Sequence, residues 1–152
     1  ELTPGRMNIF DFGDVKLMVD YAHNPDGMQM LKKFLDKTEA SVKIGIVGAA
    51  GDRRDEDLIE MGQISAEIFD EIIIRHDEDL RGRTAEEMTE FLSRGVRQVK
   101  PDLPLSVISK ETDAIDHAVR NAKPGAFITV CTEKVEETLS FSQQLFEEEQ
   151  DV

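Results

Sequence analysis

Short apolar runs alternate along this chain with longer segments that have helical periodicity. The runs lie at residues 15–19, 43–47, 71–75 and 126–131, with a shorter run at 105–109. Strands that alternate with helices in this way form βαβ units and a mostly parallel sheet with helices on both faces. Residues 7–12, joined to the next run through Gly13 and Asp14, predict an N-terminal hairpin. We therefore expect an α/β fold with a Rossmann-like, mostly parallel sheet and one antiparallel edge strand from that hairpin.

Length and charge limit the classes of protein to which the chain can belong. Its 152 residues suit a single domain over residues 1–152, and a start at Glu1 rather than methionine predicts a fragment of a larger protein. The formal net charge of −14 argues against a nucleic-acid-binding surface and against docking on an anionic membrane. The single cysteine, Cys131, excludes an intrachain disulfide and favours a cytoplasmic location. Its place at the end of an apolar run favours a core residue over a catalytic thiol.

Polar residues in front of the helical segments predict where the helices begin. Asn24 is a good N-cap, and Pro25 suits the first helical position after it. The stretch from Thr84 to Glu87 has the form of a capping box. We expect Thr112 to cap the helix that follows the run at 105–109.

A charged turn that carries Asp20 and His23 follows the apolar run at 15–19. In α/β sheets, ligands bind beside the carboxyl ends of strands and the N-termini of helices. An ionised aspartate accepts hydrogen bonds only, so it could take both hydroxyls of a ribose. Alternatively, Asp20 caps the nearby helix and His23 packs against it. The residues alone leave both interpretations open.

Two further charged turns follow the runs at 43–47 and 71–75. In the first, Gly45, Gly48 and Gly51 have the spacing G-x-x-G-x-x-G, which permits a tight turn but differs from the dinucleotide pattern G-x-G-x-x-G. The acidic residues 55–57 lie at a helix start, where they stabilise the helix dipole whatever the function. The other turn, residues 75–83, is rich in charge, as many solvated loops are. Three such turns on one side of a sheet nevertheless indicate a binding face.

Several common catalytic patterns are missing from the sequence. It contains no G-x-x-x-x-G-K-[ST] phosphate loop, so we do not expect this chain to hydrolyse ATP by itself. It contains three histidines, and neither a zinc-ligand spacing nor a Ser/His/Asp arrangement can be assembled from them. We therefore predict no metal site in this chain.

Four short motifs resemble the C-terminal domain of the Mur ligase family, in an order that spans essentially the whole chain. They are Pro4-Gly5-Arg6, the stretch from Val19 to Asp26, Gly51-Asp52-Arg53, and Ala122-Lys123-Pro124-Gly125. The resemblance implies one domain of a three-domain, ADP-forming acid–amino-acid ligase. It implies ATP and Mg²⁺ as cofactors of the full-length enzyme, with Mg²⁺ and the phosphates held mainly by a central domain that is absent here. That central domain, a small-molecule amino acid and an acyl acceptor are the implied partners, and the complete protein could form a homo-oligomer.

The resemblance also implies roles for individual residues. It places four residues beside ATP: Arg6 near the phosphates, Asp20 at the ribose, and His23 and Asn24 in the nucleotide-facing turn. It places four residues toward the incoming amino acid: Asp52, Arg53, Asp55 and Asp77. It assigns no certain catalytic residue to this domain.

Within the family, residues 51–57, 69–74 and 79–83 are more similar to members that join arginine to aspartate side chains of a growing polymer. Peptidoglycan ligases, which add an amino acid to a UDP-muramoyl precursor, differ at these turns. The acidic turns also suit arginine, because a guanidinium pairs with carboxylates in bidentate geometry. The alternatives are a peptidoglycan ligase and, in a different class, a stand-alone binding domain without catalytic function.

Overall fold

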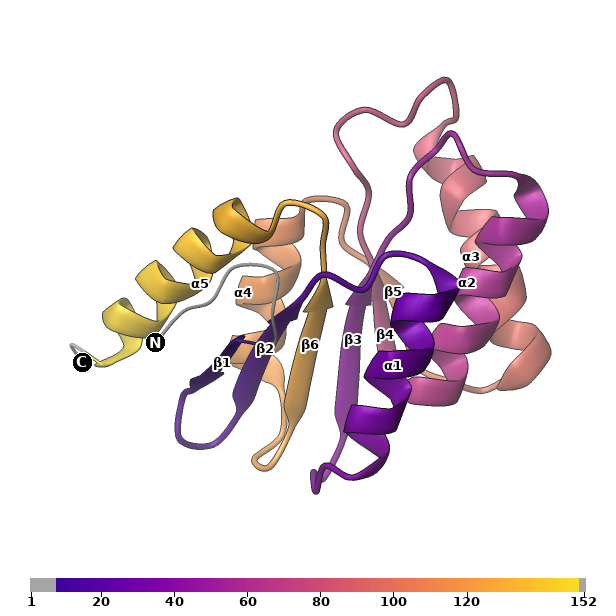
Figure 1. Cartoon of the computed structure of the whole chain (residues 1–152). Coiled ribbons are helices and arrows are strands. Elements are labelled where there is room, and N and C mark those ends of the chain that lie inside the picture. Colours follow the sequence, from indigo (N-terminus) through magenta and orange to yellow (C-terminus); the bar gives the residue numbers. More distant parts are fainter. Residues whose placement is uncertain (1–7, 151–152) are drawn as a thin grey trace.

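The computed structural model describes residues 8–150, apart from the side chain of Gln150, so the Pro4-Gly5-Arg6 motif lies outside the described residues. The chain alternates strands and helices as the sequence predicts (Figure 1). In chain order the elements are β1 (Asn8–Asp11), β2 (Lys16–Asp20), α1 (Pro25–Asp36), β3 (Lys43–Val47), α2 (Asp55–Ile68), β4 (Glu71–Ile74), α3 (Ala85–Val99), β5 (Leu105–Val107), α4 (Glu111–Asn121), β6 (Phe127–Cys131) and α5 (Val135–Gln150).

The strands form one sheet in the order β1-β2-β6-β3-β4-β5. β1 pairs antiparallel with β2, and every other neighbouring pair is parallel. The last strand in the sequence, β6, therefore lies between β2 and β3, with Phe127 in register with both Lys16 and Lys43. This arrangement confirms the predicted Rossmann-like sheet with an antiparallel edge strand.

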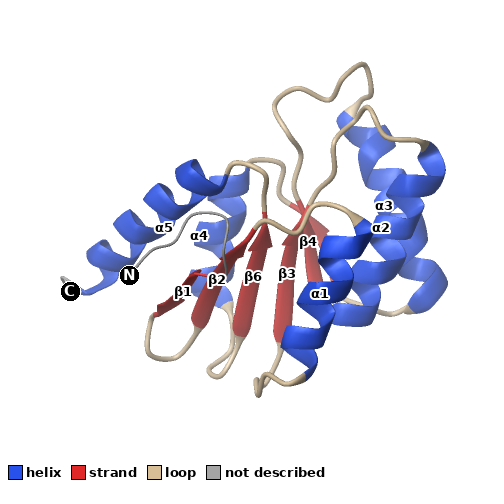
Figure 2. Cartoon of the chain, viewed as in Figure 1, coloured by secondary structure: helices blue, strands red, loops and turns tan. Residues whose placement is uncertain are grey.

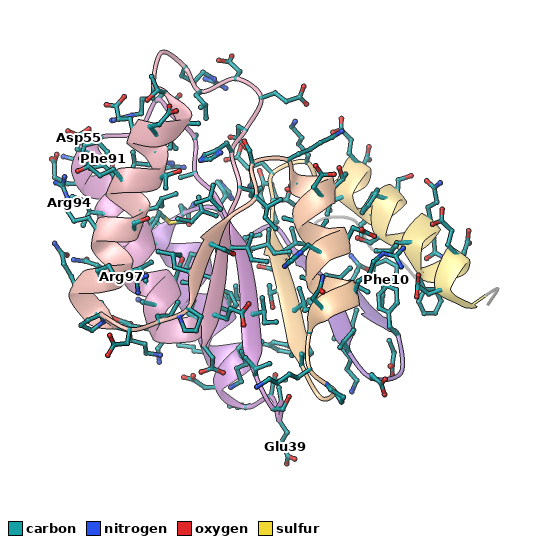
Figure 3. All side chains as sticks on the ribbon, turned by 180° about the vertical axis from the view of Figure 1, so that it is seen from behind. Phe10, Glu39, Asp55, Phe91, Arg94 and Arg97 are labelled. Atoms are coloured by element: carbon teal, nitrogen blue, oxygen red, sulfur yellow. The ribbon has the colours of Figure 1, made fainter. Side chains whose placement is uncertain are left out.

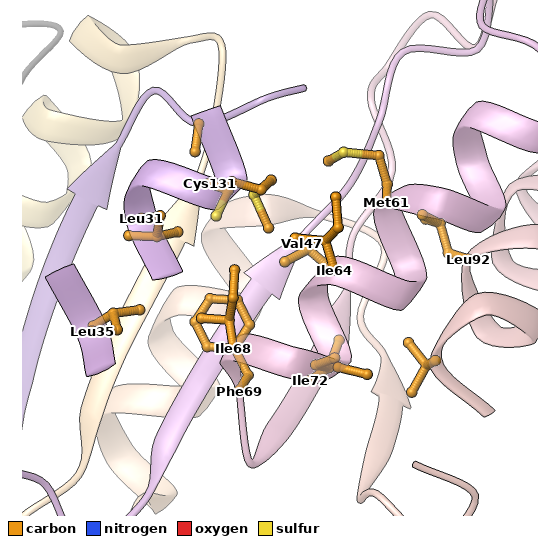
Figure 4. Close-up of a cluster of buried hydrophobic side chains, with 14 of the residues drawn as sticks. Leu31, Leu35, Val47, Met61, Ile64, Ile68, Phe69, Ile72, Leu92 and Cys131 are labelled. Atoms are coloured by element: carbon orange, nitrogen blue, oxygen red, sulfur yellow. The ribbon is translucent and has the colours of Figure 1, made fainter. Parts of the chain in front are cut away.

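Helices cover both faces of the sheet (Figure 2). Helices α1, α2 and α3 bury their apolar sides in one core cluster, and α4 and α5 bury theirs in a second cluster on the opposite face. Figure 4 shows the first cluster, to which α1 contributes Leu35, α2 contributes Ile68 and the segment before β4 contributes Phe69. A Cβ atom at Gly45 would collide with the Phe69 ring, so this glycine of β3 is required for close packing.

The helix starts agree with the sequence at two positions and differ at a third. Asn24 caps α1, its Oδ1 accepting from the Gly27 amide at 2.8 Å, and Thr84 Oγ1 accepts from the Glu87 amide at 3.0 Å. The prediction that Thr112 caps α4 is wrong: α4 begins at Glu111, and Thr112 lies inside its first turn. The N-cap is Lys110, two residues earlier than predicted, and its carbonyl accepts from the Ala114 amide.

The parallel strands end at one edge of the sheet, which gathers the charged turns there. Figure 1 shows the loops after β3 and β4 rising beyond the tips of the strands. The connection from β4 leads to α3 on one face, whereas the connection from β5 leads to α4 on the other. Ligands bind at such topological switch points in open α/β sheets. Within residues 8–150, no helix combines the length and apolar character that a membrane span requires.

Candidate functional site

A cleft of about 500 Å³ opens at the carboxyl edge of the sheet. Its walls are residues 75–78 after β4, residues 109–112 between β5 and α4, and three residues at the start of α5, Lys134, Glu137 and Thr138. The cleft therefore lies at the switch point where the β4 and β5 connections part. Of the residues that the resemblance assigns to the amino acid, Asp77 lines this cleft.

The buried side chain of Arg75 connects three segments of the cleft wall. Its Nη1 lies 2.5 Å from Asp77 Oδ1, and its Nη2 donates to the carbonyl of Cys131 at 2.9 Å. Its Nε lies 3.1 Å from Glu111 Oε2, an ion pair without hydrogen-bond geometry. Glu111 also accepts from Thr138 Oγ1 at 2.5 Å. One guanidinium thus binds two carboxylates that come from different loops.

Sequence reasoning missed Glu111, Lys134 and Thr138 as site residues. Glu111 follows the predicted strand at 105–109, so it occupies a fourth charged turn at the same edge of the sheet. Its position after a predicted strand could therefore have identified Glu111 as a candidate site residue from the sequence. Lys134 directly precedes α5 and pairs with the exposed Glu78 at 3.1 Å, and Thr138 lies in the first turns of α5. Both reach the cleft only through the sheet order.

His76 supports the cleft from the side. Its Nδ1 lies 2.8 Å from Ser109 Oγ and its Nε2 lies 2.7 Å from Thr89 Oγ1, so the ring connects the loops after β4 and β5 with helix α3. Burial, followed by the positive charge of Arg75, lowers the pKa of His76. The ring is therefore held in its neutral form at neutral pH.

The turn between β3 and α2 is organised by a second arginine, Arg83. Its guanidinium donates to the carbonyls of Gly51 and Arg53 at 2.9 and 2.7 Å and binds Asp55 Oδ1 at 2.7 Å. Asp52 pairs with Arg81 at 3.2 Å, with both side chains more than half exposed. Figure 3 shows Asp55 and Phe91 at the same end of the helix pair α2 and α3. Intrachain arginines thus already partner two of the acids assigned to the amino acid.

Arg53 differs from its neighbours in this turn. Among the described residues it has no ion-pair partner, and its Nε is buried without a hydrogen-bond partner. Its guanidinium therefore retains its hydrogen-bonding capacity. An anionic group that approached this turn would find a cation without a direct ion-pair partner, although its charge also acts on Asp57.

Asp20 ends β2 at the same edge of the sheet, on the far side of β6 from β3. It is half-buried, accepts from the Ala22 amide at 3.0 Å, and has no ion pair within the described part of the chain. Burial raises the pKa of its carboxyl group, an effect that exceeds the opposing backbone hydrogen bonds. Asn24, and not Asp20, caps the helix.

Of the other residues assigned by the resemblance, the structure describes His23 but not Arg6. His23 packs at a tilt of 53° against the ring of the exposed Tyr21, with ring centroids 4.5 Å apart, and its Nδ1 lies 2.8 Å from the Tyr21 carbonyl. Arg6 lies outside the described residues. Cys131 is buried in the core at the end of β6, and burial raises the pKa of its thiol, so it behaves as a core residue. No group of three histidine, cysteine or acidic side chains within residues 8–150 is arranged to hold a metal ion.

Comparison with known proteins identifies the family. The model of the family described as "Mur ligase, glutamate ligase domain" matches residues 5–133. The chain is 41% identical over 133 residues to the cyanophycin synthetase of a Nostoc species, a match that covers 88% of the chain. The same match covers only 15% of that relative, so the chain spans a small part of its length.

Solved structures show the same fold. A structure of UDP-N-acetylmuramoyl-L-alanyl-D-glutamate–2,6-diaminopimelate ligase gives a TM-score of 0.75 at 22% identity, covering 89% of this chain and 27% of the other. The structure of E. coli FolC in complex with ADP gives 0.68 at 20% identity, covering 94% and 32%. Because the family model matches most of the sequence and these neighbours share the fold, the chain belongs to the C-terminal, glutamate ligase domain family of the Mur ligases.

Proposed function

We propose that the chain is the C-terminal domain of an ATP-dependent, ADP-forming acid–amino-acid ligase, and that the complete protein is a cyanophycin synthetase adding arginine to an aspartate side-chain carboxylate. The observation that carries the proposal is the cleft at the switch point, whose charged lining has one more carboxylate than cation, in a chain 41% identical to a cyanophycin synthetase. In such a ligation ATP converts the carboxylate to an acyl phosphate, and the amine of the amino acid then displaces phosphate to form the amide.

The residues at the end of β2 fit the nucleotide side of this reaction. Asp20 is a half-buried carboxylate without a cationic partner among the described residues, so it can accept hydrogen bonds from the ribose. His23 and Asn24 shape the turn that carries Asp20, since Asn24 caps α1 and His23 packs on Tyr21. Arg6 is proposed to approach the phosphates. The described residues offer no site for Mg²⁺, which we assign, with most of the phosphate contacts, to the central domain.

The residues after β3 and β4 fit the amino-acid side. Arg53 has a free guanidinium that suits the carboxylate of an incoming amino acid. Asp77 lines the cleft and suits a cationic side chain. Asp52 and Asp55, which are paired with Arg81 and Arg83, are proposed to contribute through the charge of the turn.

The test uses the full-length enzyme, ATP, Mg²⁺ and an acyl acceptor with a free aspartate side chain. We expect ADP release to depend on L-arginine, with lysine a poorer substrate because an ammonium lacks the planar fork of a guanidinium. Stimulation by diaminopimelate with a UDP-muramoyl acceptor would instead establish the peptidoglycan alternative. If no amino acid stimulates ADP release, the remaining interpretation is a binding domain without ligase activity.

A matched variant separates the nucleotide side from the amino-acid side. Asp20→Ala should lower kcat/KM for ATP by about ten- to a hundredfold, the value of one charge-assisted contact, and leave the KM for arginine unchanged. The control is Asp116→Ala, which removes an exposed carboxylate that pairs with Arg120 on α4. Wild-type kinetics in Asp20→Ala would contradict the assignment of this residue to the nucleotide.

A further inference from the structure

Two carboxylates on different walls of the cleft depend on the same buried cation. Asp77 follows β4 and Glu111 begins α4, yet both are bound by Arg75, whose side chain is only 8% exposed. The two acids keep 30% and 18% of their side-chain surface exposed and line the cleft. Over the whole lining, four carboxylates stand against three cations, which leaves one unit of negative charge and matches one incoming cation: Asp77, Glu78, Glu111 and Glu137 against Arg75, Lys110 and Lys134.

The geometry of the guanidinium explains why an arginine is needed here. Nη1 binds Asp77 after β4, Nη2 donates to the Cys131 carbonyl at the end of β6, and Nε approaches Glu111. A planar fork can address three directions at once, whereas a lysine ammonium on a flexible stem is a single point charge. Arg75 therefore holds three segments of the cleft wall in one arrangement.

Gly48 of the turn after β3 makes room for this side chain. A Cβ atom at Gly48 would lie 3.0 Å from Arg75 Cζ and 3.0 Å from the Arg75 carbonyl oxygen. Both distances are shorter than ordinary van der Waals contact, and the carbonyl belongs to the backbone, so the arginine would have to shift. Gly48 thus links the glycine-rich turn to the position of Asp77 and Glu111.

We propose that Arg75 is a positioning residue for the cationic amino acid: it fixes Asp77 and Glu111 in the orientation in which their exposed oxygens receive the side chain. The inference rests on the proposed function, because it supplies the mechanism by which the cleft selects a cationic substrate. Bidentate recognition of a guanidinium needs two acceptors at fixed spacing, and a misplacement on the order of 1 Å can cost about a hundredfold. Arg75 supplies that spacing and does not itself contact the reacting atoms.

The test compares variants of the full-length ligase by the KM for L-arginine and the KM for ATP. Arg75→Gln should raise the KM for arginine by at least about tenfold, the loss of one charge-assisted contact, with the KM for ATP unchanged. Gly48→Ala should shift the KM for arginine in the same direction although it removes no charge. The matched control is Arg97→Gln. Arg97 donates to the carbonyls of Pro101 and Leu103, and Figure 3 shows it at the opposite end of the helix pair α2 and α3 from Asp55. This variant should leave both KM values unchanged.

A conservative variant distinguishes positioning from simple stabilisation. Arg75→Lys keeps a cation beside Asp77 and Glu111 but lacks the planar fork that binds both acids and the Cys131 carbonyl. If Arg75 positions the acids, the KM for arginine is raised in Arg75→Lys by more than any change in Tm explains. A wild-type KM for arginine in Arg75→Lys, or an unchanged KM in Gly48→Ala, overturns the inference. If the wild-type enzyme ligates a different amino acid, the proposed arginine substrate fails, and the same comparison with that amino acid decides the role of Arg75.

Discussion

His76 lies between two hydroxyl groups, Ser109 Oγ and Thr89 Oγ1, and connects both loops of the cleft with α3. Its pKa is lowered from the ordinary value of 6.5 by burial and by Arg75. The unfolded chain therefore binds more protons than the folded chain below about pH 6.5, and stability falls as the pH falls through the folded-state pKa. A neutral histidine is thus part of the framework of the site.

We expect His76→Gln to lose less stability between pH 7 and pH 5 than the wild type. Glutamine keeps a donor and an acceptor for the two hydroxyl groups but does not titrate in this range. The measurement is the urea midpoint of each protein at half-unit intervals of pH. Parallel pH profiles for the two proteins would show that His76 does not control acid stability.

Thr129 is a residue whose polar group is unsatisfied in the core. Its side chain is fully buried in β6, and its Oγ1 has no hydrogen-bond partner among the described residues. Thr129→Val removes the buried hydroxyl at nearly constant volume, so we expect a gain of about 1–2 kcal/mol in the free energy of unfolding. Urea denaturation measures it.

Thr132, close by in the sequence, provides the matched control. Its buried Oγ1 accepts from the Lys134 amide at 3.0 Å, and it lies 3.3 Å from Thr138 Oγ1. Thr132→Val makes the same chemical change but breaks these contacts, so it should lower the free energy of unfolding by about 1–3 kcal/mol. Equal effects of the two substitutions would mean that the hydrogen bonds of the hydroxyl group do not determine whether its removal raises or lowers the free energy of unfolding.

At the scale of elements, helices α2 and α3 pack with their backbones in contact. A Cβ atom at Gly62 would collide with the Leu92 carbonyl, and one at Gly95 would collide with the Ile59 carbonyl. Both glycines lie inside helices, where propensity alone favours alanine by about 1 kcal/mol. Close helix packing therefore outweighs local preference at this contact.

We expect Gly95→Ala to destabilise the protein by about 1–3 kcal/mol, because the helices must separate to accommodate one methyl group. The free energy of unfolding in urea is again the measurement. Ser93→Ala, two residues earlier on the same helix at a half-buried position, serves as the control and should change stability little. Stabilisation by Gly95→Ala would show that propensity dominates and that the packing adjusts.

The elements and their order could be predicted from the sequence because each carries its own periodicity. The helix start at Asn24 followed from local hydrogen-bonding capacity, and Thr112 misled because a threonine near a helix start resembles a cap even inside the first turn. The sheet order could not be predicted in this way, because the pairing of β6 with β2 and β3 depends on the whole set of helix contacts.

The cleft shows the same limit at the level of residues. Asp77, which the resemblance assigns to the amino acid, lies in a charged turn that the sequence places at this edge, and it lines the cleft. From the sequence alone, Arg75 could be treated only as one charge in a loop, because its partner Cys131 is 56 residues away in the sequence. A buried arginine is defined by partners that only the folded sheet brings together.

At the scale of the whole molecule, the sequence contains no phosphate loop to complement the turn after β2 that we propose faces the nucleotide. We therefore expect the isolated domain to fold but to release no phosphate from ATP above background in a coupled assay. The control is the full-length enzyme with its amino acid and acceptor. Phosphate release by the isolated domain that disappears in Asp20→Ala would show that this domain contains more of the active site than we propose.

The central position of β6 determines when the sheet can form during synthesis. β2 and β3 leave the ribosome early, but each must wait for residues 127–131, which pair with both of them. Until then the two halves of the sheet have open inner edges, which are templates for pairing with other chains. A nascent chain that stalls before Phe127 is therefore the species most exposed to aggregation, and ribosome pausing late in this domain should lower its yield more than pausing early.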